Sequence, residues 1–166
     1  MSNQPPPLDG IRVIEVAGQA TGYAGRQLAE LGAEVILVEP PEGAHARQRE
    51  PFIEGEVGSE HSLYPLHYNA GKRSVVLDLG SDAGTADFRR LAATADAVLE
   101  SEDLGALESL GIGYEALREA NPELLYVTVT AFGQDGPLSR YRGNDLIGAA
   151  SSGVMCLNGF PEDPPN

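Results

Sequence analysis

The stretch Ile11 to Pro40, IRVIEVAGQATGYAGRQLAELGAEVILVEP, reads as a strand, a glycine-rich turn, a helix and a second strand. Its apolar runs at 11–16 and 35–38 have the composition of strands that are covered on both faces. The unit is therefore a predicted βαβ crossover. Because open α/β sheets bind ligands outside the carboxyl ends of their strands, the turn at 17–22 is the predicted ligand site.

The predicted helix of this unit has one apolar face and a glycine at its end. The face recurs at i, i+4 and i+7, and Gly32 stands where a left-handed helix end is usual. The residues of the face are Ala24, Leu28 and Leu31. The glycines that precede and enter the helix are spaced G-x-x-x-G-x-x-G, not G-x-G-x-x-G, so NAD or FAD binding is not predicted.

The rest of the chain repeats the alternation of strand and helix. Further strands are predicted at 74–79, 96–100 and 124–130, and helices at 82–95, 104–110, 114–120 and 145–155. The stretch 39–68 shows no periodicity and is predicted to be a long surface loop. We therefore predict an α/β fold, a Rossmann-like parallel sheet with helices on both faces.

The composition indicates a soluble, acidic protein. Eleven Lys and Arg against twenty-five Asp and Glu give a net charge of −14, which argues against nucleic acid and anionic membranes as partners. There is no apolar stretch of membrane-spanning length. Cys156 is the only cysteine, so a disulfide framework within the chain is excluded. We expect Cys156 to be a small buried residue and the protein to work in a reducing, cytoplasmic setting.

Other motifs give little support to a metal or phosphate-loop site. Gly71, Lys72 and Arg73 resemble the end of a phosphate loop, but the required upstream glycine is missing. Lys72 and Arg73 could meet a phosphate or could line a solvated strand entrance, and both readings stay open. The three histidines have no metal-ligand spacing, so no metal is predicted.

Several ordered motifs together resemble the class III coenzyme A transferases, the CaiB/BaiF family. They are PLDGIRVIEVAG, LAELGAEVILVEPPEG, NAGKRSVVLDL, LGIGYEALREANPELLYVTVTAFGQDGP and YRGNDLIGAASSGVM, and they cover nearly all of 7–166. The resemblance implies the first part of the large domain of such an enzyme. It also implies acyl-CoA and carboxylic acid as substrates, and an interlocked homodimer or association with the missing part of the enzyme.

The resemblance also implies the residues that meet coenzyme A. A glutamine near the thioester matches Gln19, with Ala20 as its neighbour, and a leucine near the adenine matches Leu77. A basic residue and a second residue near the coenzyme match Arg142 and Asn144. The family's nucleophilic aspartate, which forms an acyl anhydride, lies downstream of 157–166, so no catalytic residue is expected in this chain and the chain alone is expected to be inactive.

Some positions depart from the family's pattern. The family's E-N-F-x-P-G turn is written with Ser101, Glu102 and Asp103, and its basic residue before L-G-x-G-Y-E is Ser109, so a phosphate-friendly stretch has become acidic. A degenerate, non-catalytic coenzyme A-binding or dimerisation module is therefore an alternative. Acyl-CoA racemisation is disfavoured because the racemases carry a histidine where this chain has Asn144. The expected organisation is a tail at 1–8, a Rossmann-like segment at 9–156 and a truncated connecting loop at 157–166.

Overall fold

The computed structural model describes residues 4–18, 20–55, 58 and 60–157. The chain divides into two compact units, residues 1–129 and 130–166. The first unit contains all five strands found in the described residues and is here called the sheet unit. Each unit is described by itself below.

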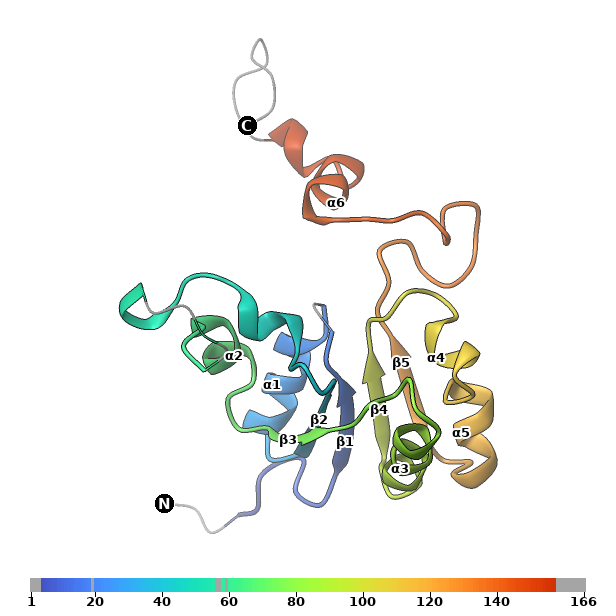
Figure 1. Cartoon of the computed structure of the whole chain (residues 1–166). Coiled ribbons are helices and arrows are strands. Elements are labelled where there is room, and N and C mark those ends of the chain that lie inside the picture. Colours follow the sequence, from blue (N-terminus) through green and yellow to red (C-terminus); the bar gives the residue numbers. More distant parts are fainter. Residues whose placement is uncertain (1–3, 19, 56–57, 59, 158–166) are drawn as a thin grey trace. The chain divides into compact units, whose positions relative to one another are not determined.

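The sheet unit holds a five-stranded sheet in the order β3-β2-β1-β4-β5 (Figure 1). Every neighbouring pair is parallel. The predicted α/β class with a parallel, Rossmann-like sheet is thus confirmed. The strands are β1 (Arg12–Val16), β2 (Glu34–Glu39), β3 (Arg73–Val76), β4 (Ala97–Glu100) and β5 (Leu125–Thr128).

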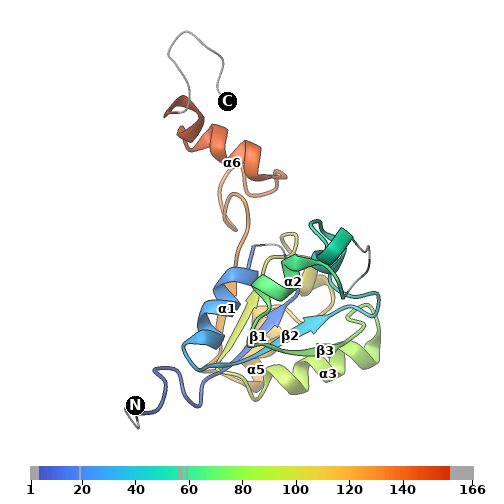
Figure 2. The same cartoon turned by 90° about the vertical axis from the view of Figure 1, so that its left-hand side faces the viewer.

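Helices connect the strands and cover both faces of the sheet (Figures 1 and 2). In the sheet unit they are α1 (Gly22–Glu30), α2 (Leu63–Tyr68), α3 (Asp82–Ala92), α4 (Ala106–Ser109) and α5 (Tyr114–Ala120). The predicted start of α3 is confirmed, because the Ser81 hydroxyl accepts from the Gly84 amide at 3.0 Å. Gly32 has a φ of 101°, which is the left-handed conformation expected after α1.

Two apolar cores lie on opposite faces of the sheet. On one face, Ile14, Val38 and Val98 pack with Phe88 of α3 and with residues of α4 and α5. On the other face, the smaller core is formed by strand residues and by the end of α1: Val13, Ala33, Val35 and Leu99, with Leu28 and Ala29 packed against them. Alternate residues of β1 therefore enter opposite cores, as a central parallel strand requires.

The loop prediction for 39–68 is wrong in its second half, because the structure has α2 there. Ser62 is fully buried and caps α2, since its hydroxyl accepts from the Tyr64 amide at 3.3 Å. One-turn 3-10 helices at His45–Gln48 and Ile53–Gly55 precede it. The six residues of α2 are too few for a periodic pattern to be visible in the sequence.

Several other predicted elements are shorter than expected. The strand predicted at 74–79 is β3, Arg73–Val76, and it pairs only with β2. The second unit contains α6 (Asp145–Ser151), followed by a 3-10 helix at Val154–Leu157 instead of a helix running to 155. Cys156 is exposed there, so the expected burial is wrong.

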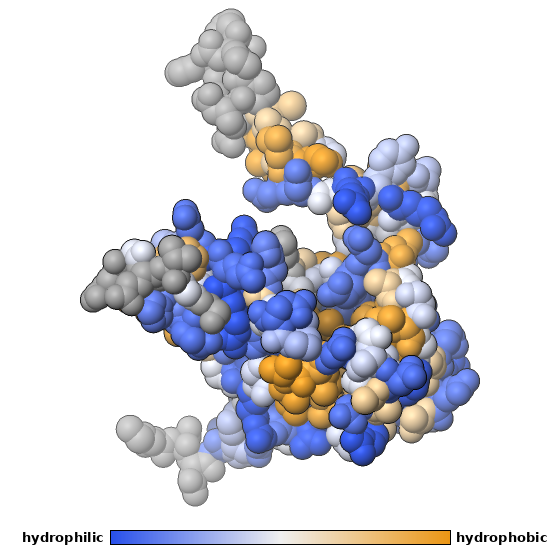
Figure 3. Space-filling model, in the orientation of Figure 1, coloured by the Kyte–Doolittle hydropathy of each residue, from blue (hydrophilic) through white to orange (hydrophobic). Residues whose placement is uncertain are grey.

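One apolar surface of the sheet unit is not covered. On β5, which is an edge strand, Leu125 is 66% exposed and Val127 is 46% exposed. They pair with Ala97 and Leu99 of β4, so they lie on the face that carries α1. Figure 3 shows that apolar residues also reach the surface on the side of the sheet unit facing the viewer, in a compact patch and in smaller groups among hydrophilic residues.

Candidate functional site

The strand order places a topological switch point between β1 and β4. From β1 the chain runs outward to β2 and β3, whereas β4 and β5 lie on the other side of β1. At such a point the loops after the two central strands diverge and leave a crevice at their carboxyl ends. The two loops here are the turn after β1, residues 17–21, and the loop after β4, residues 101–105.

Ser101 joins these two loops. The backbone amide of Ala20 donates to the Ser101 hydroxyl at 3.4 Å. A β-carbon at Gly18 would come within 1.9 Å of the same oxygen, so a larger residue there would force the Ser101 hydroxyl to move and would disturb its bond to Ala20. The first predicted glycine of the turn therefore has a structural reason, which is close packing against Ser101.

Acidic groups gather at the carboxyl end of β4. The buried carboxylate of Glu100 accepts from the Glu102 amide at 2.7 Å. The pKa of the Glu102 carboxyl is raised, first by burial and then by the negative charges of Glu100 and Asp103. An anionic ligand at the switch point would therefore meet negative charge from this side.

A buried ion pair lies under the turn after β1. Lys72 Nζ is 2.7 Å from Glu15 Oε2, and both side chains are 1% exposed. Lys72 also donates to the Gly22 carbonyl at 2.9 Å and to Asn69 Oδ1 at 3.1 Å. The Thr21 hydroxyl donates to Glu15 Oε1 at 3.4 Å. We call these five residues the anchor.

Burial and charge act in opposite directions within the anchor. Desolvation raises the pKa of the Glu15 carboxyl and lowers the pKa of the Lys72 ammonium, whereas the attraction between the two groups opposes both shifts. Lys72 therefore neither meets a phosphate nor lines a solvated entrance. It neutralises a carboxylate that β1 carries into the interior.

A second ion pair closes the carboxyl end of β2. Glu39 is 2% exposed and binds Arg47 through two bonds, Nε to Oε2 at 2.7 Å and NH2 to Oε1 at 2.8 Å. The Ser74 hydroxyl adds a bond at 2.5 Å and the Ala44 amide one at 3.2 Å. These bonds, led by those from Arg47, lower the pKa of Glu39 to about 2.

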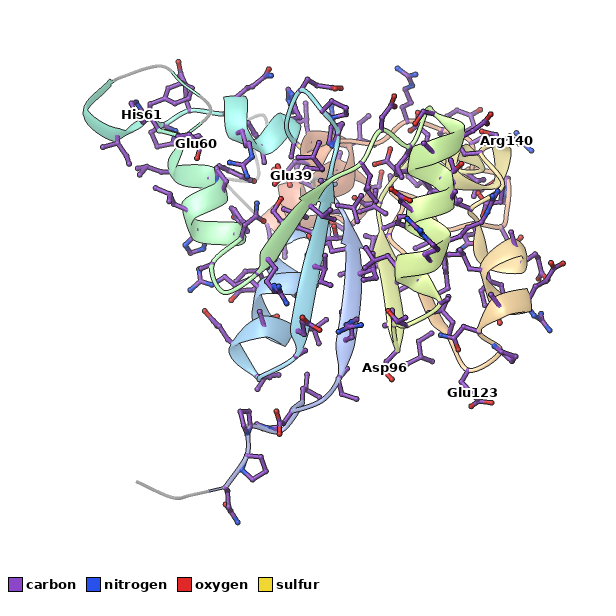
Figure 4. The ribbon with its side chains drawn as sticks, turned by 60° about the horizontal axis from the view of Figure 1, so that its bottom comes forward. Glu39, Glu60, His61, Asp96, Glu123 and Arg140 are labelled. Atoms are coloured by element: carbon purple, nitrogen blue, oxygen red, sulfur yellow. The ribbon has the colours of Figure 1, made fainter. Side chains whose placement is uncertain are left out.

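The position of Glu39 is the one where dinucleotide-binding folds place an acidic residue against a ribose. In this chain the carboxylate is held by Arg47, Ser74 and a backbone amide instead. Figure 4 shows Glu39 at the carboxyl end of β2, and Asp96 at the opposite end of the sheet. Beside Glu39, a cavity of about 170 Å³ lies between α2 and the β2–β3 edge.

Comparison with known proteins identifies the family. The family model "CoA-transferase family III" matches residues 8–166. The chain belongs to CoA-transferase family III. A relative named succinate–glutarate CoA-transferase, from Agrobacterium fabrum, is 44% identical over 99% of this chain and 42% of its own length. The BbsE subunit of a succinyl-CoA:(R)-benzylsuccinate CoA-transferase, from Thauera aromatica, is 42% identical over 93% of this chain and 38% of its own.

A solved structure shows the same fold in this family. The crystal structure of a CaiB/BaiF family protein from Brucella suis superposes with a TM-score of 0.90 at 40% identity. The matched region makes up 98% of this chain and 43% of the Brucella suis chain. The chain thus spans less than half the length of the relatives it matches.

The structure places the coenzyme-contact residues predicted for this CoA-transferase family III chain in different regions. Ala20 lies in the turn at the switch point, next to Ser101. Leu77 follows β3, its amide donates to the Glu39 carbonyl at 2.9 Å, and its side chain packs against the larger core. Gln19 lies outside the described residues. Arg142 and Asn144 belong to the second unit, which is described by itself.

Asn144 has a defined local role. It is the residue before α6, and its Oδ1 accepts from the Ile147 amide at 2.9 Å, which caps the helix. Arg142, two residues earlier, is exposed. The cap uses one of the two lone pairs of Asn144 Oδ1.

Sequence reasoning missed the anchor. Glu15 was visible as a charge inside an apolar strand, and a charge at such a position needs a buried partner. The partner, Lys72, lies far away in the sequence, and the sequence pattern contains no signal that pairs the two.

Across the described parts of the chain, no helix is long and apolar enough to span a membrane, and no group of His, Cys, Asp or Glu could hold a metal ion.

Proposed function

We propose that this chain is the coenzyme A-binding first part of a class III CoA transferase, which moves coenzyme A between an acyl-CoA and a carboxylic acid. The observation that carries the proposal is the family match over residues 8–166 on a sheet whose switch point lies between β1 and β4. At that point the turn after β1 approaches the loop after β4 closely, with Gly18 and Ala20 next to Ser101.

The proposed contacts keep the roles that the family resemblance implies. Gln19 and Ala20 lie near the thioester, Leu77 near the adenine, and Arg142 and Asn144 near the coenzyme. Arg142 supplies a positive charge. Such charges are scarce in this chain, whose net charge is −14. The assembled enzyme is proposed to be a cytoplasmic homodimer.

The proposed chemistry begins with a carboxylate nucleophile outside these 166 residues. Its oxygen attacks the thioester carbonyl and forms an anhydride, while the carbon–sulfur bond breaks and the sulfur leaves as the coenzyme A thiolate. The thiolate then attacks the enzyme's own carbonyl carbon of this anhydride, which releases the donor as its free carboxylate and leaves an enzyme–coenzyme A thioester. The acceptor carboxylate attacks that thioester to form a second anhydride, and the released thiolate takes the acceptor's acyl carbon, which gives the new acyl-CoA and regenerates the enzyme carboxylate. The role of this chain is to hold the coenzyme and the thioester in place.

The names of the relatives suggest the first substrates to assay. Both relatives described above are named for succinate or succinyl-CoA. We therefore propose succinyl-CoA as the acyl donor and a dicarboxylic acid such as glutarate as the acceptor for the whole enzyme. Transfer by the full-length protein, followed as formation of glutaryl-CoA, tests this choice.

Calorimetric titration of the 166-residue chain with coenzyme A tests the binding role. Saturable binding supports the proposal, and residues 1–166 should show no acyl transfer when assayed alone. Transfer by this chain, at a rate that survives purification controls, would place the nucleophile within it and contradict the proposal.

The acidic surroundings of the switch point favour a second candidate, a non-catalytic module. Glu100, Glu102 and Asp103 lie at the carboxyl end of β4, next to Ser101. If the chain binds no coenzyme A at low ionic strength but still assembles with itself or with a partner, the module is the better description.

A further inference from the structure

We propose that the anchor, Glu15 and Lys72 with Thr21, Gly22 and Asn69, positions the turn after β1 for the thioester. Lys72 and Glu15 are thus positioning residues of the site. This inference rests on the proposed function for its ligand. Its structural part, that the anchor holds the turn, does not depend on that function.

The first argument is that three separate groups hold the buried ammonium. Lys72 Nζ donates to the Gly22 carbonyl and to Asn69 Oδ1, and it forms an ion pair with Glu15 Oε2 at 2.7 Å. These acceptors belong to β1, to the start of α1 and to the turn before β3. One buried group therefore ties three separate segments together.

The second argument is that the anchor reaches the turn at consecutive residues. Thr21 is fully buried and donates to Glu15, and Gly22 accepts from Lys72. Ala20 is exposed on the other side of the same turn, where its amide meets Ser101. The turn is thus held by the anchor at Thr21 and Gly22, and by Ser101 of the loop after β4 at Ala20. Together these bonds fix the direction of the Ala20 amide.

The third argument is that the sequence makes room for the pair. A β-carbon at Gly25 would come within 1.8 Å of Glu15 Oε2 and 3.0 Å of Lys72 Nζ. A glycine inside a helix lowers helix stability relative to alanine. Gly25 nevertheless stands in α1, one turn after Gly22, because the Glu15 carboxylate and the Lys72 ammonium occupy the space that a side chain would need.

The fourth argument is that an ion pair is not needed for stability alone. Buried ion pairs can be replaced by apolar residues of similar volume without loss of stability, whereas removal of one partner is strongly destabilising. What an apolar replacement cannot supply is a donor for the Gly22 carbonyl and an acceptor for the Thr21 hydroxyl. Turn geometry and fold stability can therefore be separated by experiment.

The test variant is Glu15→Leu/Lys72→Met in the 166-residue chain. The control variant is Arg12→Met/Glu34→Gln, which removes an ion pair of 2.7 Å between β1 and β2 at the opposite end of the sheet. Urea unfolding reports stability, hydrogen exchange reports the amides of residues 20–22, and calorimetry reports coenzyme A binding.

We expect the test variant to unfold in urea close to the wild-type midpoint. Its turn amides should exchange roughly tenfold faster, and its affinity for coenzyme A should fall by about tenfold, as expected for the loss of a hydrogen bond to a charged group. The control variant should change neither the exchange of the turn amides nor the affinity for coenzyme A. Unchanged exchange at residues 20–22 in the folded test variant would overturn the proposal.

A third variant decides the question if the test variant does not fold. Thr21→Val keeps the ion pair but cuts the bond to Glu15 Oε1, so faster exchange at residues 20–22 is again expected, and wild-type exchange would overturn the proposal. If the wild-type chain binds no coenzyme A, the proposed function fails. The exchange measurement then still decides whether the anchor holds the turn.

Discussion

Gly25 and Glu15 are in such close contact that no larger residue fits at position 25. A β-carbon there would lie 1.8 Å from Glu15 Oε2 and 2.8 Å from the carboxyl carbon. Neither atom can withdraw easily, because Glu15 is on the central strand and its carboxylate is held by Lys72.

Gly25→Ala should therefore destabilise the sheet unit, by about 3 kcal/mol, through overpacking and disruption of the buried pair. This is the opposite of the usual effect of alanine in a helix. Gly148→Ala in α6 is the matched control, because nothing lies within 4 Å of its added β-carbon. Urea denaturation checks both, and a Gly25→Ala chain as stable as wild type would contradict the close contact.

Glu39 predicts a pH dependence of stability. Its pKa is lowered to about 2 in the folded chain, chiefly by Arg47. Its contribution is therefore fully present above the ordinary pKa of 4.5 and is lost as the pH falls from there toward 2. The shift corresponds to roughly 3 kcal/mol at neutral pH, of which about 2 kcal/mol should be gone at pH ~3.

Glu39→Gln provides the control for this effect. The difference in unfolding free energy between wild type and Glu39→Gln should narrow as the pH is lowered from 7 to about 3. Urea titrations at several pH values measure it. A difference that stays constant over this range would show that the carboxylate is not held by Arg47 in solution.

Arg142→Ala should weaken coenzyme A binding by roughly one to two decades, since a charge-assisted bond to a phosphate contributes about 1.5–3 kcal/mol. Lys72→Ala is unsuitable as a comparison, because Lys72 is buried in the anchor and its loss would disturb folding. Arg90→Ala is the better control, because it removes an 80% exposed cation from α3. Equal affinities of Arg142→Ala and wild type at low salt would remove Arg142 from the site.

The uncovered face of β5 should make the 166-residue chain self-associate. Leu125 and Val127 are exposed on an edge strand, where both apolar surface and unpaired backbone groups are available. Leu125→Lys/Val127→Thr should shift the chain toward the monomer in light scattering. Leu157→Ser, at an 84% exposed leucine outside the sheet, is the control and should have little effect. A monodisperse wild-type monomer would count against this prediction.

The fold could be predicted because its two central strands, β1 and β2, are apolar runs with clear ends. Gly32 marked a helix end and has the expected conformation, and α3 begins at the predicted residue 82, after the Ser81 cap. The missed helix, α2, is a single short element whose cap, Ser62, is held by backbone carbonyls at positions 46 and 49. Such a cap depends on tertiary contacts, which a periodic pattern does not contain.

For the candidate site, only the place of the turn in the fold could be predicted and checked, and ligand binding there stays a prediction. The turn after β1 follows from the βαβ pattern, and Ala20 does lie at the switch point. The roles of Glu15, Lys72 and Ser101 depend on which distant segments the sheet brings together, so residue type alone gave the wrong surroundings for Lys72. The coenzyme contacts assigned to Gln19, Leu77, Arg142 and Asn144 stay predictions.

The position of β1 in the middle of the sheet determines the order in which a ribosome can complete this fold. One edge of β1 pairs with β2, which follows it directly, whereas the other edge waits for β4, and the bond from the Arg12 amide to Asp96 spans 84 positions. At the usual rate of synthesis β4 emerges about 5 s after β2. During that interval the nascent chain carries an apolar strand edge without a partner. The growing chain is therefore most prone to misassembly before β4 pairs with β1.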